Sequence, residues 1–423
     1  MNFQARYQKA TLWIILIPLL IAAGCEEQES VPIFTESNTG PYVLNVDYLE
    51  HLKENIREKS YLNAEYLSLI EGADQLLSEE FLYVTDKYYT PPSGDKHDYM
   101  SLSRYLWPDS TGAYTIYRDG VTNPEIYNYD RPKLAAISFA SYTLALAYYY
   151  TGEEAYASKA SELIRGWFLN PETKMNPNMD HAQVAPGVNN GSGQGIIDAN
   201  DFIPVLDAVS LIYDSPSWTF GDHKRLKEWF FQFSTWLERN YNTDAYSTTN
   251  VSIWMDAQRA IYYLFTEQTD RLNSNSHIPP VTDRIGKQFN SQGEQPNEIT
   301  RARPMHYVYF NLLGYMNLTM IRKNIGKNDR DWQILNSPNY GGLKPAIDLL
   351  VSLMQGKSVG DSIPAEPKFD LCRYIEIFLP ASVAFESKNY EEEAFRLLRE
   401  GCSNPSVSLV YPKLSDYDES EAF

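Results

Sequence analysis

A long helical segment, followed after a very short turn by a second one, sets the strongest limit on how this chain folds. Residues 132–152, PKLAAISFASYTLALAYYYTG, are apolar on most sides of a helix and end at Gly152. Residues 153–169, EEAYASKASELIRGWFL, then carry a second helical pattern. Because the connection is only about two or three residues long, the helices must be antiparallel neighbours. The chain therefore contains at least one largely buried helical hairpin.

Helical periodicity continues along most of the chain after residue 45. Similar patterns occupy residues 46–59, 201–213, 222–241, 252–265, 304–322, 343–354 and 370–385. No sustained alternation of polar and apolar residues is found, so no strands are predicted. Repeated hairpins predict an all-α fold, a toroid or superhelix, within one domain spanning residues 41–423. No sequence repeat of fixed period appears, which disfavours a tetratricopeptide or HEAT solenoid.

The first 24 residues have the pattern of an export signal. Arg6 and Lys9 precede an apolar run, TLWIILIPLLIAAG, which at about fourteen residues is short for a membrane helix. The small residues before Cys25 resemble a lipoprotein cleavage box, so Cys25 is predicted to carry a lipid. Residues 25–40 are then an acidic tether. We expect a bacterial protein of the periplasm or cell surface, attached to the outer membrane only by this lipid; an ordinary signal peptide is the alternative.

The charge and the aromatic content of the chain limit its partners. A formal net charge of −19 argues against nucleic acid and against an anionic membrane surface as general partners. Aromatic residues make up 14% of the chain, with 32 tyrosines and 8 tryptophans. Such residues stack on flat, partly polar ligands such as sugar rings, but they also pack between helices. Composition alone leaves both interpretations open.

Neither metal nor cofactor chemistry is predicted. The six histidines form no His-x-x-x-His pair and no HExxH motif; they are His51, His97, His181, His223, His277 and His306. No Gly-rich phosphate loop follows a strand, and no GxSxG elbow is present. Cys372 and Cys402 would pair in an oxidising compartment, but two free thiols are equally compatible with the sequence.

The stretch TRARPMHYVYF, residues 300–310, gathers cationic and proton-transferring groups in an acidic chain. Pro304 suits the first turn of a helix. Arg301 and Arg303 would then lie just before the helix N-terminus, where free backbone N–H groups and the helix dipole favour an anion such as a carboxylate. Tyr307 would lie on the first turn, and His306 about 100° away around the helix. The alternative is that both arginines form surface ion pairs.

Two other segments are candidates for ligand contact. Asn250 begins a helical pattern, where it either caps the helix or turns its amide to a ligand. The loop at residues 91–109 is richer in aromatic and cationic residues than a solvated loop usually is, and it is predicted to be a binding surface. Its candidate residues are Lys96, His97, Tyr99, Arg104, Tyr105 and Trp107. The long loops at residues 88–131 and 170–200 are often functional features in compact domains.

Several ordered motifs between about residues 85 and 350 resemble the alginate lyase domain family of polysaccharide lyases. They are SGDKHDYMSLSRYLWPD, RDGVTNPE, MNPNMDHAQVAPGVNNGSGQGIID, WMDAQRAIYYLF and RARPMHYVYFNL. The resemblance implies an α/α toroid, or incomplete barrel, of helical hairpins with a long substrate cleft. It also implies β-elimination on a 1,4-linked polyuronate such as alginate, so the expected partner is an acidic polysaccharide.

The resemblance also implies roles for individual residues. Asn250 and Arg301 would hold the uronate carboxylate, and Tyr307 would transfer protons. As a base, Tyr307 needs its pKa lowered from about 10, and the nearby arginine and the helix N-terminus are predicted to lower it. In place of the histidine that the family has beside this asparagine, the chain has Val251. We hypothesise that His181 or His306 supplies the missing imidazole. The residues predicted to bind substrate are Lys96, His97, Tyr99, Trp107, Gln183, Trp254 and Arg303.

Three other functions remain open at this point. The substitution at Val251 leaves room for a different polyuronate, such as glucuronan, and for a catalytically weak lipoprotein that binds acidic glycan. A glycoside hydrolase on the same kind of fold would need two carboxylates across the scissile bond. The available carboxylates are Asp180, Asp198, Asp201 and Asp256.

Overall fold

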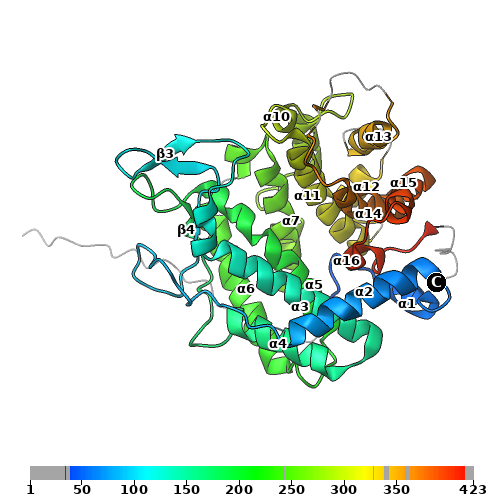
Figure 1. Ribbon diagram of the computed structural model, residues 1–423, viewed down its shortest axis with the longest axis horizontal. Coiled ribbons are helices and arrows are strands. Elements are labelled where there is room, and N and C mark those ends of the chain that lie inside the picture. Colours follow the sequence, from blue (N-terminus) through cyan, green and yellow to red (C-terminus); the bar gives the residue numbers. More distant parts are fainter. Residues whose placement is uncertain are drawn as a thin grey trace, which may run out of the picture. The chain divides into compact units, whose positions relative to one another are not determined.

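The computed structural model describes residue 34 and residues 39–241, 243–326, 328–337, 343–357, 363–364 and 366–414 (Figure 1). The predicted signal peptide, Cys25 and most of the predicted tether lie outside these residues. Everything described belongs to a single compact unit, residues 33–423. None of its described helices has the length and apolar character needed to span a membrane.

Helices dominate the described residues. The helices of the first half are α1 (Val46–Asn55), α2 (Ser60–Leu77), η1 (Pro124–Asn128), α3 (Arg131–Thr151), α4 (Glu154–Phe168), η2 (Gly193–Asp201), α5 (Phe202–Leu211), α6 (Phe220–Asn240) and η3 (Thr243–Tyr246). Those of the second half are α7 (Asn250–Phe265), α8 (Thr269–Leu272), α9 (Val281–Gln288), α10 (Pro296–Ile299), α11 (Pro304–Ile325), α12 (Arg330–Leu335), α13 (Leu343–Met354), η4 (Leu371–Tyr374), α14 (Ile375–Phe385), α15 (Lys388–Arg399) and α16 (Pro405–Ser408). The prediction of a helical chain is confirmed.

The hairpin expected from the sequence is formed by α3 and α4. Gly152 adopts a left-handed conformation (φ 73°) and donates its N–H to the carbonyl of Tyr148, which ends α3. This conformation is unfavourable for residues that have a Cβ, so glycine suits the position. Helix α3 also packs against α5, and its apolar residues are buried along most of its length. Helices α7 and α11 pack closely on each other, and α11 also packs against α14.

The structure contains four short strands that the sequence did not predict. Strand β1 (Met100–Leu102) pairs in parallel with β4 (His181–Val184). Strands β2 (Leu106–Pro108) and β3 (Tyr114–Tyr117) form an antiparallel pair, drawn in cyan in Figure 1. The expectation of no strands is therefore wrong. Strands of three or four residues are too short to show the alternation of polar and apolar residues from which strands are predicted.

The aromatic residues contribute strongly to helix packing. Phe202 on α5 lies edge-on to Trp229, Phe230 and Phe233 of α6, with ring centroids 5.4 to 5.8 Å apart. Such edge-to-face pairs add to the burial of the rings. Seven tyrosines are among the largest fully buried side chains: Tyr48, Tyr99, Tyr262, Tyr263, Tyr309, Tyr315 and Tyr374. Packing between helices therefore accounts for much of the aromatic content, while Tyr88 and Tyr127 remain exposed.

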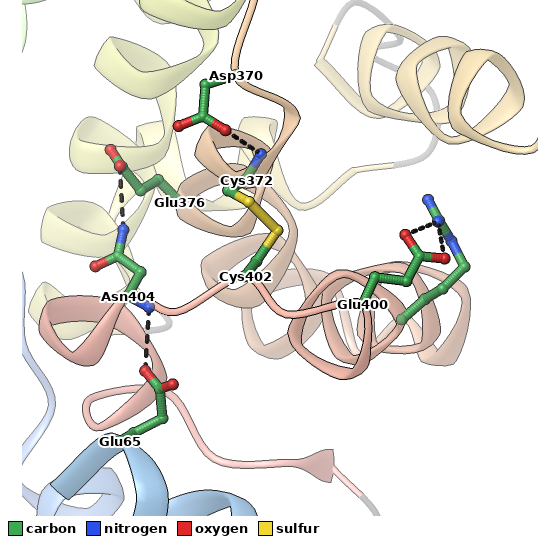
Figure 2. The surroundings of a disulfide bond; sticks show 8 residues. Glu65, Asp370, Cys372, Glu376, Glu400, Cys402 and Asn404 are labelled. Atoms are coloured by element: carbon green, nitrogen blue, oxygen red, sulfur yellow. Dashed lines mark hydrogen bonds and ion pairs between the residues drawn. A yellow bond between two sulfur atoms is a disulfide. The ribbon is translucent and has the colours of Figure 1, made fainter. Parts of the chain in front are cut away.

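A disulfide joins Cys372 in η4 to Cys402, which follows α15 (Figure 2). The sequence left this pairing open. Asp370 accepts a hydrogen bond from the backbone of Cys372 at 3.0 Å. Asn404 donates to Glu65 and Glu376, so the segment after Cys402 is also tied to α2 and α14. The disulfide thus fixes one end of η4, which leads directly into α14.

We expect the double substitution Cys372→Ser, Cys402→Ser to lower the free energy of unfolding by about 3 kcal/mol, because the bond closes a loop with a sequence separation of 30. Urea unfolding of the variant and of the oxidised wild type measures the difference. Wild-type protein treated with a reductant should approach the variant. Equal midpoints for oxidised wild type and variant would contradict the prediction.

Candidate active site

The segment that begins α11 has the local structure predicted from its proline. Pro304 is the first residue of α11, and Arg303 precedes it. The short helix α10 ends at Ile299, so Arg301 and Arg303 lie in the junction between two helices. Tyr307 donates its backbone N–H to the carbonyl of Arg303 on the first turn of α11. The junction therefore presents two arginines and a tyrosine beside one helix N-terminus.

Both arginines of the junction are paired with carboxylates. Arg301 donates from Nε and Nη2 to Asp119, at 3.0 and 2.6 Å. Arg303 donates from Nε to Glu366 at 2.8 Å. Both arginines thus form ion pairs, and these pairs are partly buried rather than confined to the surface. Hydrogen bonds from Arg301 lower the pKa of Asp119 to about 2, so Asp119 is ionised.

Tyr307 lies directly beneath Arg301. The guanidinium carbon of Arg301 is 3.7 Å from the centroid of the Tyr307 ring, a cation–π contact. The Tyr307 side chain is only 6% exposed, and its buried hydroxyl makes no well-aligned hydrogen bond among the described residues. Burial, followed by the neighbouring hydroxyl of Tyr105, raises the pKa of Tyr307, and the opposing effect of Arg301 is smaller.

The direction of this pKa shift corrects the prediction. The sequence suggested that arginine and a helix N-terminus would lower the pKa of Tyr307. Arg301 does act in that direction, but removal of the phenolic oxygen from water dominates. Tyr307 is consequently a neutral phenol at neutral pH.

Asn250 is held by a buried carboxylate. It is the first residue of α7, and the N-cap position belongs to Thr249. Glu298 of α10 accepts from the Asn250 backbone N–H at 2.8 Å and from its side-chain Nδ2 at 3.0 and 2.9 Å. The capping role considered for Asn250 is therefore wrong. Burial raises the pKa of Glu298. The adjacent Val251 is 7% exposed and packs in the hydrophobic core.

The two candidate histidines have different surroundings. His306 lies beside Tyr307, with ring centroids 5.2 Å apart, and stacks on Phe310 at 6.2 Å. Its Nδ1 is buried without a hydrogen-bond partner among the described residues. Burial, then the charges of Arg303 and Arg373, lowers the pKa of His306 to about 4, so the imidazole is neutral at pH 7.

His181 occupies the first position of β4, opposite Met100 of β1. Its Nδ1 is 2.9 Å from the carbonyl oxygen of Asn190. Its electrostatic partner is Asp98, whose pKa it helps to lower, although hydrogen bonds from Ser93, Asn176 and Asn178 contribute more. Of the two histidines, only His306 has a ring contact with Tyr307 among the described residues.

The predicted binding loop contains both exposed and structural residues. Lys96 is exposed, and Trp107 of β2 lies under the guanidinium of Arg118 at 4.6 Å. His97 is partly buried, and its Nδ1 lies 2.7 Å from the carbonyl oxygen of Lys174. Tyr99 is fully buried and donates its hydroxyl to Asp198 at 3.1 Å. A side chain with no accessible surface cannot touch a polymer, so burial argues against the binding role predicted for Tyr99.

Gln183 and Trp254 complete the predicted set. Gln183 has a left-handed backbone (φ 52°), unusual for a residue with a side chain, and is fixed between Ser101 and Ser103 by hydrogen bonds at 2.8 and 2.9 Å. Trp254 is nearly buried and donates its indole N–H to the carbonyl of Phe310 at 3.1 Å. Both Trp254 and Phe310 line a cavity of about 430 Å³.

This cavity lies among α3, α5, α7, α11, α14 and α16. Its wall combines aromatic side chains with Arg131, Arg373 and Glu376. The guanidinium of Arg373 lies 4.8 Å from the Tyr309 ring centroid, and its charge contributes to the lowered pKa of His306. Phe310 connects the cavity wall to His306, which stacks on it. Ring contacts through Phe310 and His306 therefore link the cavity wall to Tyr307, which does not itself line the cavity.

Sequence reasoning missed three charged residues of this site: Asp119, Glu298 and Arg373. Asp119 lies within RDGVTNPE, one of the motifs that resemble the family, but the motif alone indicates no role for its carboxylate. Glu298 precedes Arg301 by three residues, and nothing local indicates that it reaches Asn250. No group of three or more His, Cys, Asp or Glu side chains is placed to hold a metal ion within the part of the chain that the structure describes.

The helical architecture and its matches to known proteins define the class, a polysaccharide lyase with an α/α-toroid fold. The chain belongs to the alginate lyase family, whose model, described as alginate lyase, matches residues 83–359. An alginate lyase from Bacteroides ovatus, solved at 1.60 Å resolution, is 30% identical; the match covers 88% of this chain and 99% of that one, with a TM-score of 0.78. The predicted fold and family are confirmed.

A more distant match concerns the fold alone. A variant of alginate lyase A1-III complexed with a tetrasaccharide is 13% identical, with 89% of this chain and 98% of that chain covered and a TM-score of 0.52. No curated protein matches the sequence.

Proposed function

We propose that this lyase cleaves a 1,4-linked, alginate-like polyuronate by β-elimination, with Tyr307 as the proton-transferring residue. The observation that carries the proposal is that the ring of Tyr307 lies under the guanidinium of Arg301, while its buried hydroxyl makes no well-aligned hydrogen bond among the described residues. A proton-transfer group and a fixed cation are thereby joined at the N-terminus of α11. The Bacteroides ovatus relative is named an alginate lyase, which supports the substrate class.

The chemistry requires both groups. The proton on C5 of a uronate is weakly acidic, because the adjacent carboxylate is already negative. Cationic and N–H donors at that carboxylate stabilise the charge that develops when C5 loses its proton. The electron pair left on C5 forms the C4=C5 double bond as the C4–O4 bond breaks, and O4 takes up a proton. We assign carboxylate stabilisation to Arg301 and proton transfer to Tyr307. The role predicted for Asn250 is not kept, because its backbone N–H and its Nδ2 already donate to Glu298.

The protonation state of Tyr307 predicts the pH profile. As a neutral phenol it is ready to donate a proton to O4, whereas it removes the C5 proton only as a phenolate. Because burial raises its pKa above the ordinary value of about 10, the phenolate fraction increases throughout the accessible alkaline range. We expect kcat/KM to rise with pH without a plateau below about pH 10. A plateau near neutral pH would exclude a rate-limiting Tyr307 phenolate.

We propose that the neutral imidazole of His306, beside Tyr307, takes the place of the histidine that the family has at the position of Val251. We expect His306→Ala to lower kcat by roughly 10²-fold, within the range for a lost acid–base group. His181→Ala, whose ring bonds to a backbone carbonyl of its own segment, should retain a rate close to that of the wild type. Initial rates on the same polymer test both variants, and full activity in both would eliminate the idea.

Val251 is the observation that favours a second candidate, a protein that binds acidic glycan with little catalysis. The same substitution leaves glucuronan as an alternative polymer substrate for the lyase. A hydrolase is not favoured, because Asp256 is committed to a buried pair with Arg284 at 2.6 Å, and Asp198 and Asp201 both face Arg131. Retention on a polyuronate affinity gel without any product would identify a binder.

We also propose that the protein is exported and anchored through a lipid on Cys25. The disulfide between Cys372 and Cys402 supports export, because such bonds persist in oxidising compartments. Incorporation of labelled fatty acid into the wild type, and its loss in Cys25→Ser, is the expected result. Labelling that persists in the variant would contradict lipidation at this residue.

A further inference from the structure

We propose that Asp119 is a positioning residue for the reaction and fixes the guanidinium of Arg301 against the ring of Tyr307. The proposal rests on the lyase function proposed above. Its basis is one carboxylate, contributed by the loop after β3, that receives four hydrogen bonds. Two come from Arg301, one from the backbone N–H of Ala302 at 2.9 Å and one from the Tyr117 hydroxyl at 3.0 Å.

The four bonds fix both partners of the pair. Nε and Nη2 of Arg301 meet the two oxygens of Asp119 side by side, a bidentate geometry that sets the plane of the guanidinium. The Ala302 N–H anchors the same carboxylate to the backbone of the junction, and Tyr117 anchors it to β3. Arg301 therefore has little freedom to leave the Tyr307 ring, which lies 3.7 Å below it.

The segment that carries Asp119 is shaped to fit the junction. Gly120 has a left-handed backbone (φ 72°), and a Cβ at this position would lie 2.8 Å from Cγ of Arg303. Glycine therefore permits the close approach that brings Asp119 to Arg301. The two residues are 182 positions apart in the chain. The hairpin of β2 and β3, at the edge of the helices in Figure 1, thus completes a site that α10 and α11 begin.

The bidentate contact still leaves Arg301 able to bind substrate. Asp119 accepts hydrogen bonds from Nε and Nη2 of Arg301, whereas Nη1 donates no hydrogen bond to any of the residues described. A uronate carboxylate would bind a guanidinium whose orientation is already set. Less free energy is then needed to order Arg301 in the transition state. The rival explanation is that Asp119 occupies the place of the substrate carboxylate and competes with it.

The two explanations predict opposite kinetic effects. Loss of a positioning residue lowers kcat with little change in KM, because the affected interaction matters most in the transition state. Loss of a competitor lowers KM and raises kcat/KM. We expect Asp119→Asn to reduce kcat by roughly 10- to 100-fold with KM changed less than about threefold. Glu125→Gln is the matched control: this carboxylate also bonds a β3 tyrosine, Tyr114, but does not touch Arg301.

A double-variant cycle shows whether Asp119 acts through Arg301. Initial rates are measured for wild type, Asp119→Asn, Arg301→Ala and the double variant on one polyuronate. In the Arg301→Ala background, we expect Asp119→Asn to cause no further loss beyond about twofold. Losses that multiply would overturn the proposal. So would a rise in kcat/KM for Asp119→Asn, or an equal loss in Glu125→Gln.

The same cycle separates this proposal from the function on which it rests. If the wild type is active and the losses multiply, the positioning role fails and the lyase function stands. If the wild type releases no unsaturated product from any polyuronate, the proposed function fails and the positioning role fails with it.

Discussion

Tyr307→Phe is expected to lower kcat by about 10³-fold, within the range of roughly 10² to 10⁴ that acid–base groups contribute. The substitution removes one oxygen atom and leaves the ring that packs under Arg301. Because the hydroxyl makes no well-aligned hydrogen bond among the described residues, its removal should cost little stability. Rates from the absorbance of unsaturated product, together with a thermal melt, measure the two effects separately.

Tyr315→Phe provides the control for this result. Tyr315 lies on the same helix, is fully buried and donates its hydroxyl to Gln288 at 3.2 Å. Its loss leaves a buried acceptor without that partner, so the variant should be slightly less stable and fully active. If both variants lose activity to the same extent, or if Tyr307→Phe remains active, Tyr307 is not the proton-transfer residue.

Arg301→Ala is the second substitution with a large expected effect. It removes the cation proposed to stabilise the uronate carboxylate, and a loss of one such donor typically costs about 10²- to 10³-fold in kcat. It also leaves Asp119 without its main partner, which adds an unpaired negative charge at the site. Arg301→Lys should recover little, because an ammonium cannot reproduce the bidentate contact with Asp119.

The chain offers a closely matched arginine for comparison. Arg165 on α4 is likewise partly buried, pairs with a carboxylate, Asp222, at 2.7 Å and lies over an aromatic ring, that of Trp218. It has no contact with the α10–α11 junction among the described residues. Arg165→Ala should therefore reduce stability without changing kcat. Equal kcat losses in both variants would mean that Arg301 acts through stability alone.

Local features of the fold were predictable because they depend on neighbouring residues. Pro304 marked the start of α11, and Gly152 marked the end of α3. Helical periodicity identified the long buried helices. The toroid itself came from the family resemblance, since periodicity alone allowed a superhelix. The short strands were missed because β1 and β4 pair across about 80 residues and have no pattern of their own.

The site was only partly predictable, because its decisive contacts join distant residues. The sequence identified Arg301, Tyr307 and Asn250 as candidates. It did not reveal that Asp119 holds Arg301 or that Glu298 holds Asn250, 48 residues away. The raised pKa of Tyr307 was also inaccessible, because burial depends on the packing of the whole junction. Residue types and helix ends are local, whereas desolvation and pairing are properties of the assembled fold.

The most direct test of the proposed function is ultraviolet absorbance of the unsaturated uronate product. The mature protein is incubated separately with alginate, polymannuronate, polyguluronate and glucuronan, and reducing ends are counted in parallel. We predict absorbance that increases in step with new reducing ends on at least one of these polymers, and that disappears with Tyr307→Phe. New reducing ends without absorbance would contradict β-elimination.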